Sequence, residues 1–395
     1  TQPPDYVDCE VLHIASGETH TIRCRYLVSC EGARSSIRNR MGARLAGREV
    51  VTKLCTTYIR APEIQRRWPH RPGWMHRIYN PDGESHIVAI NGTDLWLHHS
   101  FLGPDADLDA HDHRPAINNA FGFAFDYEVL GQERWTARAM VVDRYRDGRV
   151  FLCGDAAHIW IPMGGFGMNA GVEDAVNLAW KLGATLSGWA GPAILDSYEQ
   201  ERRAIGQLVA GSAARILETM YKIPVDDPLF EADGSAADAR RAEIGHSITR
   251  HNMSEFDSIG MQLGVSYDTS PIICHDGSEA PPFAIDRYTE SSRPGVRAPH
   301  FWRANGAALY DELGPAYTLL RIGNAPPDAH DLVAAFAAAN VPLTVLDVAE
   351  PEAVTKYERY ALVLIRPDQH IAWRGRSLPR DPGGVVATLT ATADT

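Results

Sequence analysis

The stretch RVFLCGDAAHIWIPMGGFGMNAGVEDAVNLAWKL, residues 149–182, is the part of the sequence most informative about the fold. Residues 150–153 form a short apolar run that stops at a Gly-Asp pair, as a buried strand does when its carboxyl end opens into a site. A loop with three glycines follows, and beyond Met168 apolar residues recur every three or four positions, which predicts a helix. The first turn of a helix has unpaired N–H groups and partial positive charge, so this unit favours a ligand that carries or develops negative charge.

The motifs GDAAH, PMGGFGMNAG and EDAVNLAWKL within this stretch resemble the second flavin-binding motif of the FAD-dependent aromatic hydroxylases. These are the single-component phenol and 3-(3-hydroxyphenyl)propionate monooxygenases. The resemblance implies that Asp155, after Gly154, holds the ribityl chain of FAD. It also implies that the loop and helix start lie against the pyrimidine side of the flavin, through Pro162, Gly165, Gly167, Met168 and Asn169.

The loop departs from the family pattern at one place. Many relatives have two prolines where this chain has Ile161 and Pro162, and Trp160 beside them is unusual. We expect Trp160 and Ile161 to face the substrate side. The alternative for the whole stretch is an ordinary strand-to-helix crossover whose glycines serve only the turn.

Composition limits the possible classes of protein. The chain has 395 residues, of which 45% are hydrophobic and 22% charged, as in globular proteins of two or three domains. A net charge of −12 argues against nucleic acid or an anionic membrane as the main partner. No apolar run approaches the length of a membrane span, so a soluble, cytoplasmic protein is expected. The cysteines show neither a CxxC motif nor metal-type pairing with histidine, so no metal site is predicted.

A second motif lies near the start of the chain. After a short apolar strand at residues 26–29, the run CEGARSSIR resembles the family's other internal signature, DGxxSxVR, with Glu31 in place of the aspartate. In relatives this motif supports the pyrophosphate side of the flavin and the route of the nicotinamide cofactor. Arg34 and Arg38 are the residues that could meet phosphate. The alternative is that both arginines are solvated.

The family also carries an upstream strand-helix-strand unit with a GxGxxG turn that binds the FAD pyrophosphate. We find no free candidate for that turn in these 395 residues. We therefore expect either a further N-terminal segment, which we favour, or a natural fragment that needs a partner chain. On either account, the chain by itself should bind FAD poorly.

The expected fold is α/β, with an incomplete Rossmann-type FAD-binding domain, an antiparallel-sheet substrate domain and a thioredoxin-like domain. The predicted ranges are 1–55 and 136–284 for the two FAD motifs and their helices, 56–135 for the sheet, and 285–395 for the last domain. Residues 260–273 resemble a return strand of the family. No cysteine follows Cys274, so the last domain should have a packing or dimerisation role, with a homodimer as one outcome.

The substrate pocket is expected against the antiparallel sheet at 56–135. Strand alternation puts Trp96, His98 and Ser100 on one face, and His98 could hydrogen-bond a phenol oxygen if that face looks toward the flavin. Arg77 and Tyr79 are further candidates. A structural histidine is the alternative for His98, and the sequence does not name the residue that activates the phenol.

The resemblance implies an enzyme in which NADPH or NADH reduces FAD, and the reduced flavin reacts with O2 to form a C4a-hydroperoxide. That peroxide transfers OH to a ring carbon ortho or para to a phenolic oxygen. Three rivals stay open: a non-catalytic or split-chain partner fragment of a flavoprotein, a flavin-dependent halogenase, and an FAD-linked reductase of lipid double bonds. The predicted partners are a small aromatic substrate and O2.

Overall fold

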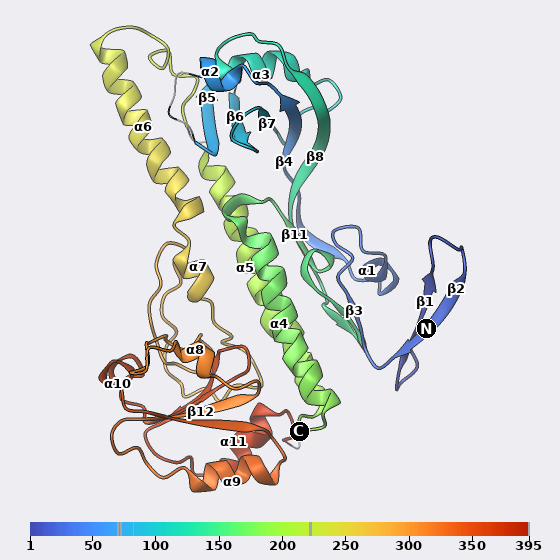
Figure 1. Ribbon diagram of the computed structural model, residues 1–395, viewed down its shortest axis with the longest axis vertical. Coiled ribbons are helices and arrows are strands. Elements are labelled where there is room, and N and C mark those ends of the chain that lie inside the picture. The colour runs from blue at the N-terminus through green and yellow to red at the C-terminus, as the bar shows by residue number, and fades with distance from the viewer. Residues whose placement is uncertain (69–70, 72, 82, 221–222, 394–395) are drawn as a thin grey trace.

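The computed structural model describes residues 1–68, 71, 73–81, 83–220 and 223–393. The molecule is elongated (Figure 1). An antiparallel sheet lies at one end, the long helices α4 (Phe166–Leu186) and α5 (Asp196–Met220) run along the middle, and a small α/β domain lies at the other end. Within the described ranges, no helix combines the length and apolar character needed to cross a membrane.

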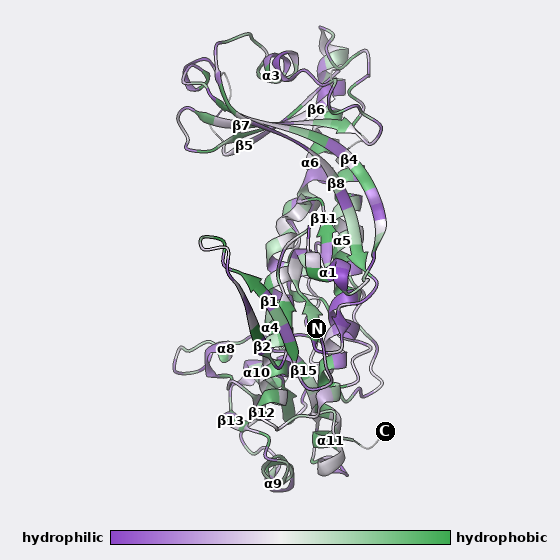
Figure 2. Ribbon diagram, turned by 90° about the vertical axis from the view of Figure 1, so that its right-hand side faces the viewer, coloured by the Kyte–Doolittle hydropathy of each residue, from purple (hydrophilic) through white to green (hydrophobic). Residues whose placement is uncertain are grey.

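Six strands form the large sheet, in the order β11-β8-β4-β7-β6-β5, with every neighbouring pair antiparallel. Their bounds are β4 (Leu45–Arg60), β5 (Met75–Asn80), β6 (Gly83–Ala89), β7 (Leu95–Gly103), β8 (Glu128–Val142) and β11 (His158–Trp160). The long strands β4 and β8 curve from this sheet down into the body of the molecule (Figure 2). The predicted boundaries of the sheet domain, at residues 55 and 135, fall inside these two strands. The sheet and the FAD-binding part are therefore connected by continuous strands.

The two faces of the sheet pack against different parts of the protein. One face carries Ile59, Ile87 and Trp96, which form a cluster with the helices α2 (Ile64–Arg67) and α3 (His113–Phe121). We call this the outer face. The opposite face carries Leu54, Phe101 and Trp135, which pack against the main core beside the glycine-rich loop. We call this the inner face.

The two flavin-like motifs come together in the middle part of the molecule, around a small sheet of order β3-β10-β9. Strand β3 (Leu27–Ser29) runs parallel to β10 (Val150–Leu152), and β9 (Arg146–Asp147) is antiparallel to β10. The hairpin of β1 (Val7–Leu12) and β2 (Thr19–Cys24) precedes β3, and helix α1 (Ser36–Arg40) follows β3. The short 3-10 turns η1 (Gly154–Ala156) and η2 (Met163–Gly165) lead from β10 into α4.

The predicted return strand at residues 260–273 is wrong. Helix α6 (Ser235–Phe256) is followed by the short helix α7 (Ile259–Leu263) and then by a loop. Within residues 260–273, the described strand pairing is a single antiparallel bridge between Ser266 and Val296. The loop is held by side chains instead, because Tyr267 and Ser270 hydrogen-bond to residues of α5.

The last hundred residues form a four-stranded sheet in the order β13-β12-β14-β15, with β13 parallel to β12 and the other pairs antiparallel. The order and directions are those of a thioredoxin-like domain, which confirms the predicted fold. Its elements are α8 (Leu309–Glu312), β12 (Tyr317–Ile322), α9 (His330–Ala338), β13 (Leu343–Val348), α10 (Pro351–Lys356), β14 (Leu362–Ile365), β15 (Ile371–Gly375) and α11 (Pro382–Leu389).

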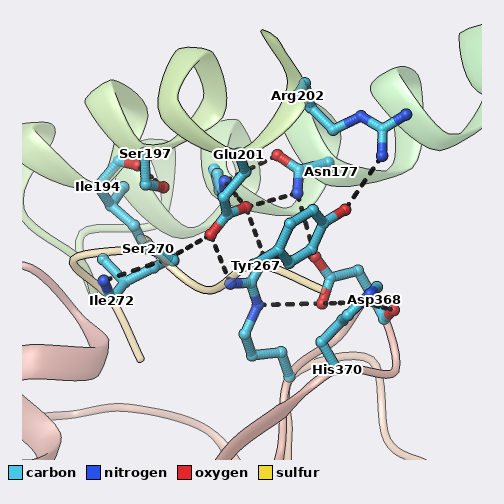
Figure 3. Close-up of polar contacts among 12 residues, drawn as sticks. Asn177, Ile194, Ser197, Glu201, Arg202, Tyr267, Ser270, Ile272, Asp368 and His370 are labelled. Atoms are coloured by element: carbon cyan, nitrogen blue, oxygen red, sulfur yellow. Dashed lines mark hydrogen bonds and ion pairs between the residues drawn. The ribbon is translucent and has the colours of Figure 1, made fainter. Parts of the chain in front are cut away.

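A buried polar cluster joins this domain to the long helices. Arg366, in the turn after β14, donates two hydrogen bonds to Glu201 of α5, at 2.6 and 2.9 Å, and both side chains are completely buried. Lys181 of α4 also binds Glu201, at 2.6 Å. Asn177 points from α4 toward Asp368, and Glu201 points from α5 toward Ser270 in the loop after α7 (Figure 3). Such a set of matched charges fixes the docking geometry of the two units.

Candidate functional site

The two flavin-like motifs meet at the carboxyl ends of β3 and β10. Arg38, buried at the start of α1, donates one hydrogen bond to the carbonyl of Ala33 at 2.7 Å and another to the carbonyl of Ala156 at 3.2 Å. A single guanidinium therefore joins the turn after β3 to the turn after β10, although these turns are separated by more than a hundred residues. Arg38 is used in this structural link, whereas Arg34 is exposed beside it.

Glu31, predicted as a cofactor-binding residue, has a structural role in this arrangement. Its carboxylate accepts hydrogen bonds from the hydroxyls of Ser29, Ser35 and Ser36 and from the backbone N–H of Ile37, at 2.7–2.9 Å. Although burial acts to raise its pKa, these hydrogen bonds lower the pKa of Glu31 to about 2. Glu31 stands where the family has aspartate, and its carboxylate accepts from the N–H of Ile37 in the first turn of α1.

The turn after β10 is pressed against helix α4. A Cβ placed on Gly154 would lie 3.7 Å from the Cα of Gly171, and Gly154 has a left-handed φ of +60°. The Gly154 N–H donates to the buried Asp174 carboxylate at 3.1 Å. This packing leaves the next residue, Asp155, exposed to solvent at the mouth of the strand. The Asp155 carboxylate is therefore open to a ligand.

The glycine-rich loop presents its backbone to solvent where α4 begins. Gly165 precedes the helix with φ +67° and ψ 23°, a left-handed conformation that favours glycine. Pro162, Gly165, Met168 and Asn169 are exposed, and the Met168 side chain is 78% accessible. The first turn of α4, whose N–H groups have no partner within the helix, thus begins at exposed residues, and α4 contacts the turn that carries Asp155.

Trp160 and Ile161, predicted to face the substrate, are placed differently from each other. Ile161 is wholly within the main core, so the prediction for this residue is wrong. Trp160 is half-buried and stacks on His158 with ring centres 4.2 Å apart. Its Nε1 is buried and makes no hydrogen bond to any residue in the described ranges, and it lies 3.8 Å from the position of a Cβ on Gly167. A donor without a partner at the edge of the glycine loop is suited to a ligand acceptor.

The structure does not bring His98 to this loop. His98, Trp96 and Ser100 are on the outer face, where Trp96 contacts Phe121 of α3. Burial is the main reason that the pKa of His98 falls to about 3, with neighbouring histidines acting in the same direction. Strand alternation correctly grouped these residues, but it could not show which face looks toward the loop.

The inner face carries the polar groups that the sequence analysis did not identify. His86 Nε2 lies 3.0 Å from a Glu84 oxygen, both side chains are 7% exposed, and the His86 ring packs on Phe101 at 4.6 Å. His99 Nδ1 lies 2.8 Å from the Thr56 hydroxyl. Burial lowers the pKa of His86 and lowers that of His99 to about 4, so both rings are neutral near pH 7.

A hollow of about 400 Å³ opens on the same inner face. It is lined by Thr56, Tyr58, Leu97 and Glu133, together with Ile90, Gly131 and Gln132. The volume and the mixture of apolar and polar walls are within the range of small-molecule sites.

Arg77 and Tyr79 also lie on the inner face, at its far edge. Arg77 pairs with Glu255 of α6 and donates to the Asn252 side chain at 2.8 Å, and the Tyr79 hydroxyl contacts Asn252 at 3.3 Å. These contacts hold α6 against β5. The two candidates therefore lie on the face opposite His98, where their side chains bind the protein itself.

His158, the last residue of the GDAAH motif, belongs to a buried set of charges beneath the loop. Its Nε2 lies 2.8 Å from Asp174, which also accepts a hydrogen bond from Arg202 at 2.7 Å. Although burial acts to raise its pKa, Arg202 and His158 hold the pKa of Asp174 below its ordinary value. The alternating acidic and basic residues of α4 and α5 were a signal for this network, but its partners lie far apart in sequence.

The exposed groups at this edge suit FAD. The Asp155 carboxylate can accept hydrogen bonds from the hydroxyls of a ribityl chain, and the N–H groups at Met168 and Asn169 can meet the electron-rich pyrimidine edge. Close packing of Gly154 against Gly171 lets a flat ligand approach the backbone. Among the residues that the structure describes, no group of three side chains that could hold a metal ion occurs.

Comparison with known proteins agrees with this geometry. Residues 1–213 match the FAD binding domain family, and residues 291–395 match the aromatic-ring hydroxylase C-terminal family. The chain therefore belongs to the family of FAD-dependent aromatic-ring monooxygenases.

Individual relatives give the same family. The chain is 28% identical to FAD-dependent monooxygenase opdD of Penicillium oxalicum, over 94% of this chain and 75% of that protein. It is 30% identical to 4-methyl-5-nitrocatechol 5-monooxygenase of a Burkholderia species, over 93% of this chain and 68% of that protein. Across curated relatives such as these, the chain spans 63–75% of their length.

Among solved structures, the rebeccamycin biosynthetic enzyme RebC with reduced flavin superposes with a TM-score of 0.87 at 33% identity. The superposition covers 100% of this chain and 73% of that chain. It confirms the predicted α/β flavoprotein fold over the whole described molecule.

Proposed function

We propose that this protein takes part in an FAD-dependent monooxygenase reaction that adds one oxygen atom of O2 to a phenolic aromatic ring, with NADH or NADPH as reductant. The observation that carries the proposal is the placement of the two flavin-like turns, joined by Arg38, beside the exposed start of α4. When bound there, FAD supplies the redox chemistry with O2. The protein supplies binding, orientation and proton handling.

Asp155 and the first turn of α4 would hold the cofactor. The exposed carboxylate would fix the ribityl chain, while the helix N-terminus would stabilise negative charge at the pyrimidine edge. Trp160 would give its free Nε1–H to an acceptor at the edge of the loop. Met163 and Phe166, buried below the loop, give the site a dry apolar floor that limits access of water.

The inner face would hold the substrate. An aromatic ring in the hollow beside Thr56 and Tyr58 would lie on the same face as the His86–Glu84 pair. With Nε2–H donated to Glu84, the Nδ1 of His86 has a lone pair that can accept the proton of a phenol. Removing that proton raises the electron density of the ring carbons ortho and para to the oxygen, which favours attack on an electrophilic oxygen.

The direct test uses the product of the complete reading frame that encodes this chain. We expect bound yellow flavin, and NAD(P)H oxidation accelerated by one member of a panel of phenols with a hydroxylated product. A protein that takes up no added FAD would overturn the cofactor assignment. Flavin-bound protein whose only products are halogenated, and only when halide is present, would overturn the hydroxylase assignment in favour of a halogenase.

A further inference from the structure

Cys30 and Cys153 occupy equivalent positions at the carboxyl ends of two neighbouring parallel strands. The register of β3 and β10 pairs Ser29 with Leu152, and each cysteine is the next residue. The N–H of Cys153 donates to the carbonyl of Ser29 at 3.0 Å, which continues the ladder up to the cysteines. Neighbouring strands lie about 4.8 Å apart. A disulfide needs Cα atoms about 4.4–6.8 Å apart, so the backbone spacing suits one.

The two thiols differ in their surroundings. Both are free, Cys30 is exposed, and Cys153 is buried with its Sγ 3.9 Å from the carbonyl of Gly171. Because residues paired across neighbouring strands project to the same face of a sheet, the two side chains continue the register on the same side. Burial, followed by the nearby Asp174 carboxylate, raises the pKa of the Cys153 thiol to about 12. An oxidant therefore meets Cys30 first, because that sulfur is accessible and Cys153 is shielded and protonated.

We propose that Cys30 and Cys153 are a peroxide-sensitive modification site, at which hydrogen peroxide closes a disulfide across the ends of β3 and β10. The Cys30 sulfur attacks one oxygen of H2O2, the O–O bond breaks, and a sulfenic acid and one water form. The Cys153 sulfur then attacks the sulfenic sulfur, an S–S bond forms, and a second water leaves. The two thiols lose two protons and two electrons, and one H2O2 becomes two H2O.

The position of this site connects it to the cofactor. Cys30 directly precedes Glu31, and Cys153 directly precedes the Gly154 turn that packs on Gly171. The disulfide draws Cys153 away from Gly171 and ties the two turns together, so the oxidised protein binds FAD more weakly. This consequence rests on the proposed function, whereas formation of the disulfide does not.

The hairpin provides an internal comparison. Cys9 and Cys24 also lie close together, on β1 and β2, but they are diagonal in the antiparallel register and lie away from the turns that follow β3 and β10. A C9S/C24S variant therefore removes the other close pair of cysteines and keeps the proposed site. A C30S variant changes only an exposed side chain of the proposed site, so it should fold.

The test treats the full protein with dilute H2O2, blocks remaining thiols and identifies cross-linked peptides by mass spectrometry. We expect a Cys30–Cys153 peptide pair that is released by a dithiol reductant, that persists in C9S/C24S and that disappears in C30S. Free thiols at both positions, overoxidation of Cys30 without a cross-link, or cross-links only to other cysteines would each overturn the proposal. FAD titration of reduced and oxidised protein then measures the expected loss of affinity separately.

Discussion

Arg366 of the C-terminal domain and Glu201 of α5 form a two-point ion pair that is completely removed from solvent, 165 residues apart in sequence. Ser270 donates to the same carboxylate, and Asp368 binds the same guanidinium. Although burial acts to raise its pKa, Arg366 and Lys181 lower the pKa of Glu201 below its ordinary range. The carboxylate is thus ionised, and the domain is held by charge as well as by apolar packing.

Replacing Arg366 with alanine should strongly destabilise the protein. The change leaves Glu201 and Asp368 buried without their main cation, and breaking a buried pair in this way costs about 3–5 kcal/mol. Arg321→Ala is the matched control in the same domain, because its pair with Asp347 is partly exposed and should contribute less than about 1 kcal/mol. Chemical unfolding of the two variants measures the difference. Equal losses of unfolding free energy in the two variants would show that the buried Arg366 pair stabilises the protein no more than the partly exposed Arg321 pair.

Replacing Glu31 with glutamine should lower stability at pH 7 but not in acid. The folded-state pKa of Glu31 is about 2, against an ordinary value of 4.5, so its stabilisation is fully present above 4.5 and is lost as pH falls toward 2. The carboxylate is exposed and screened by solvent, so we expect an effect of about 1 kcal/mol. The difference in unfolding free energy between wild type and E31Q, measured from pH 7 to pH 3, should shrink. A difference that stays constant over this range would contradict the role of the charge.

Replacing Asp155 with asparagine should weaken FAD binding without affecting folding. The side chain is exposed, and loss of hydrogen bonds to a charged group costs about 1.5–3 kcal/mol, or roughly 10- to 100-fold in affinity. Asp147→Asn, also exposed but on β9 before the start of β10, is the control and should bind FAD as the wild type does. Titration of the apoprotein, followed by flavin fluorescence, measures both. Unchanged affinity in D155N would remove Asp155 from the site.

Replacing His86 with alanine should slow hydroxylation while FAD remains bound. A positioned proton acceptor contributes about 10²–10⁴-fold to rate, and we expect a loss in that range together with a changed pH profile. His98→Ala is the control on the outer face, where loss of the ring should reduce stability but leave the rate per folded molecule largely unchanged. If H98A and H86A lose activity equally and keep the wild-type pH profile, the inner face does not supply the acceptor.

The sequence predicted what is local in this protein. The glycine loop and the start of α4 follow from a short motif and helical periodicity, and the structure has them close to the expected positions. Arg38 illustrates the limit. The sequence suggested that Arg38 could meet phosphate, whereas the buried guanidinium donates to the carbonyls of Ala33 and Ala156, and the second of these bonds depends on two strands meeting in space.

The substrate wall could not be predicted for a related reason. Alternation along β7 separates His98 from His99 but gives no sign of which side faces the loop. That choice is made by α3, whose Ile117 and Phe121 cover Trp96 and so bury the outer face. The pairing of His86 with Glu84 on the inner face could not be predicted, because no motif in the sequence marks these two residues.

The source of the transferred oxygen atom distinguishes a monooxygenase from other flavoproteins, and isotope labelling identifies that source. The flavin-bound protein is supplied with NAD(P)H, its preferred phenol and ¹⁸O2 in unlabelled water. The molecular mass of the product is then measured by mass spectrometry. We expect one ¹⁸O atom in each molecule of hydroxylated product. A product whose new oxygen comes from water, or turnover that adds no oxygen at all, would contradict a monooxygenase function.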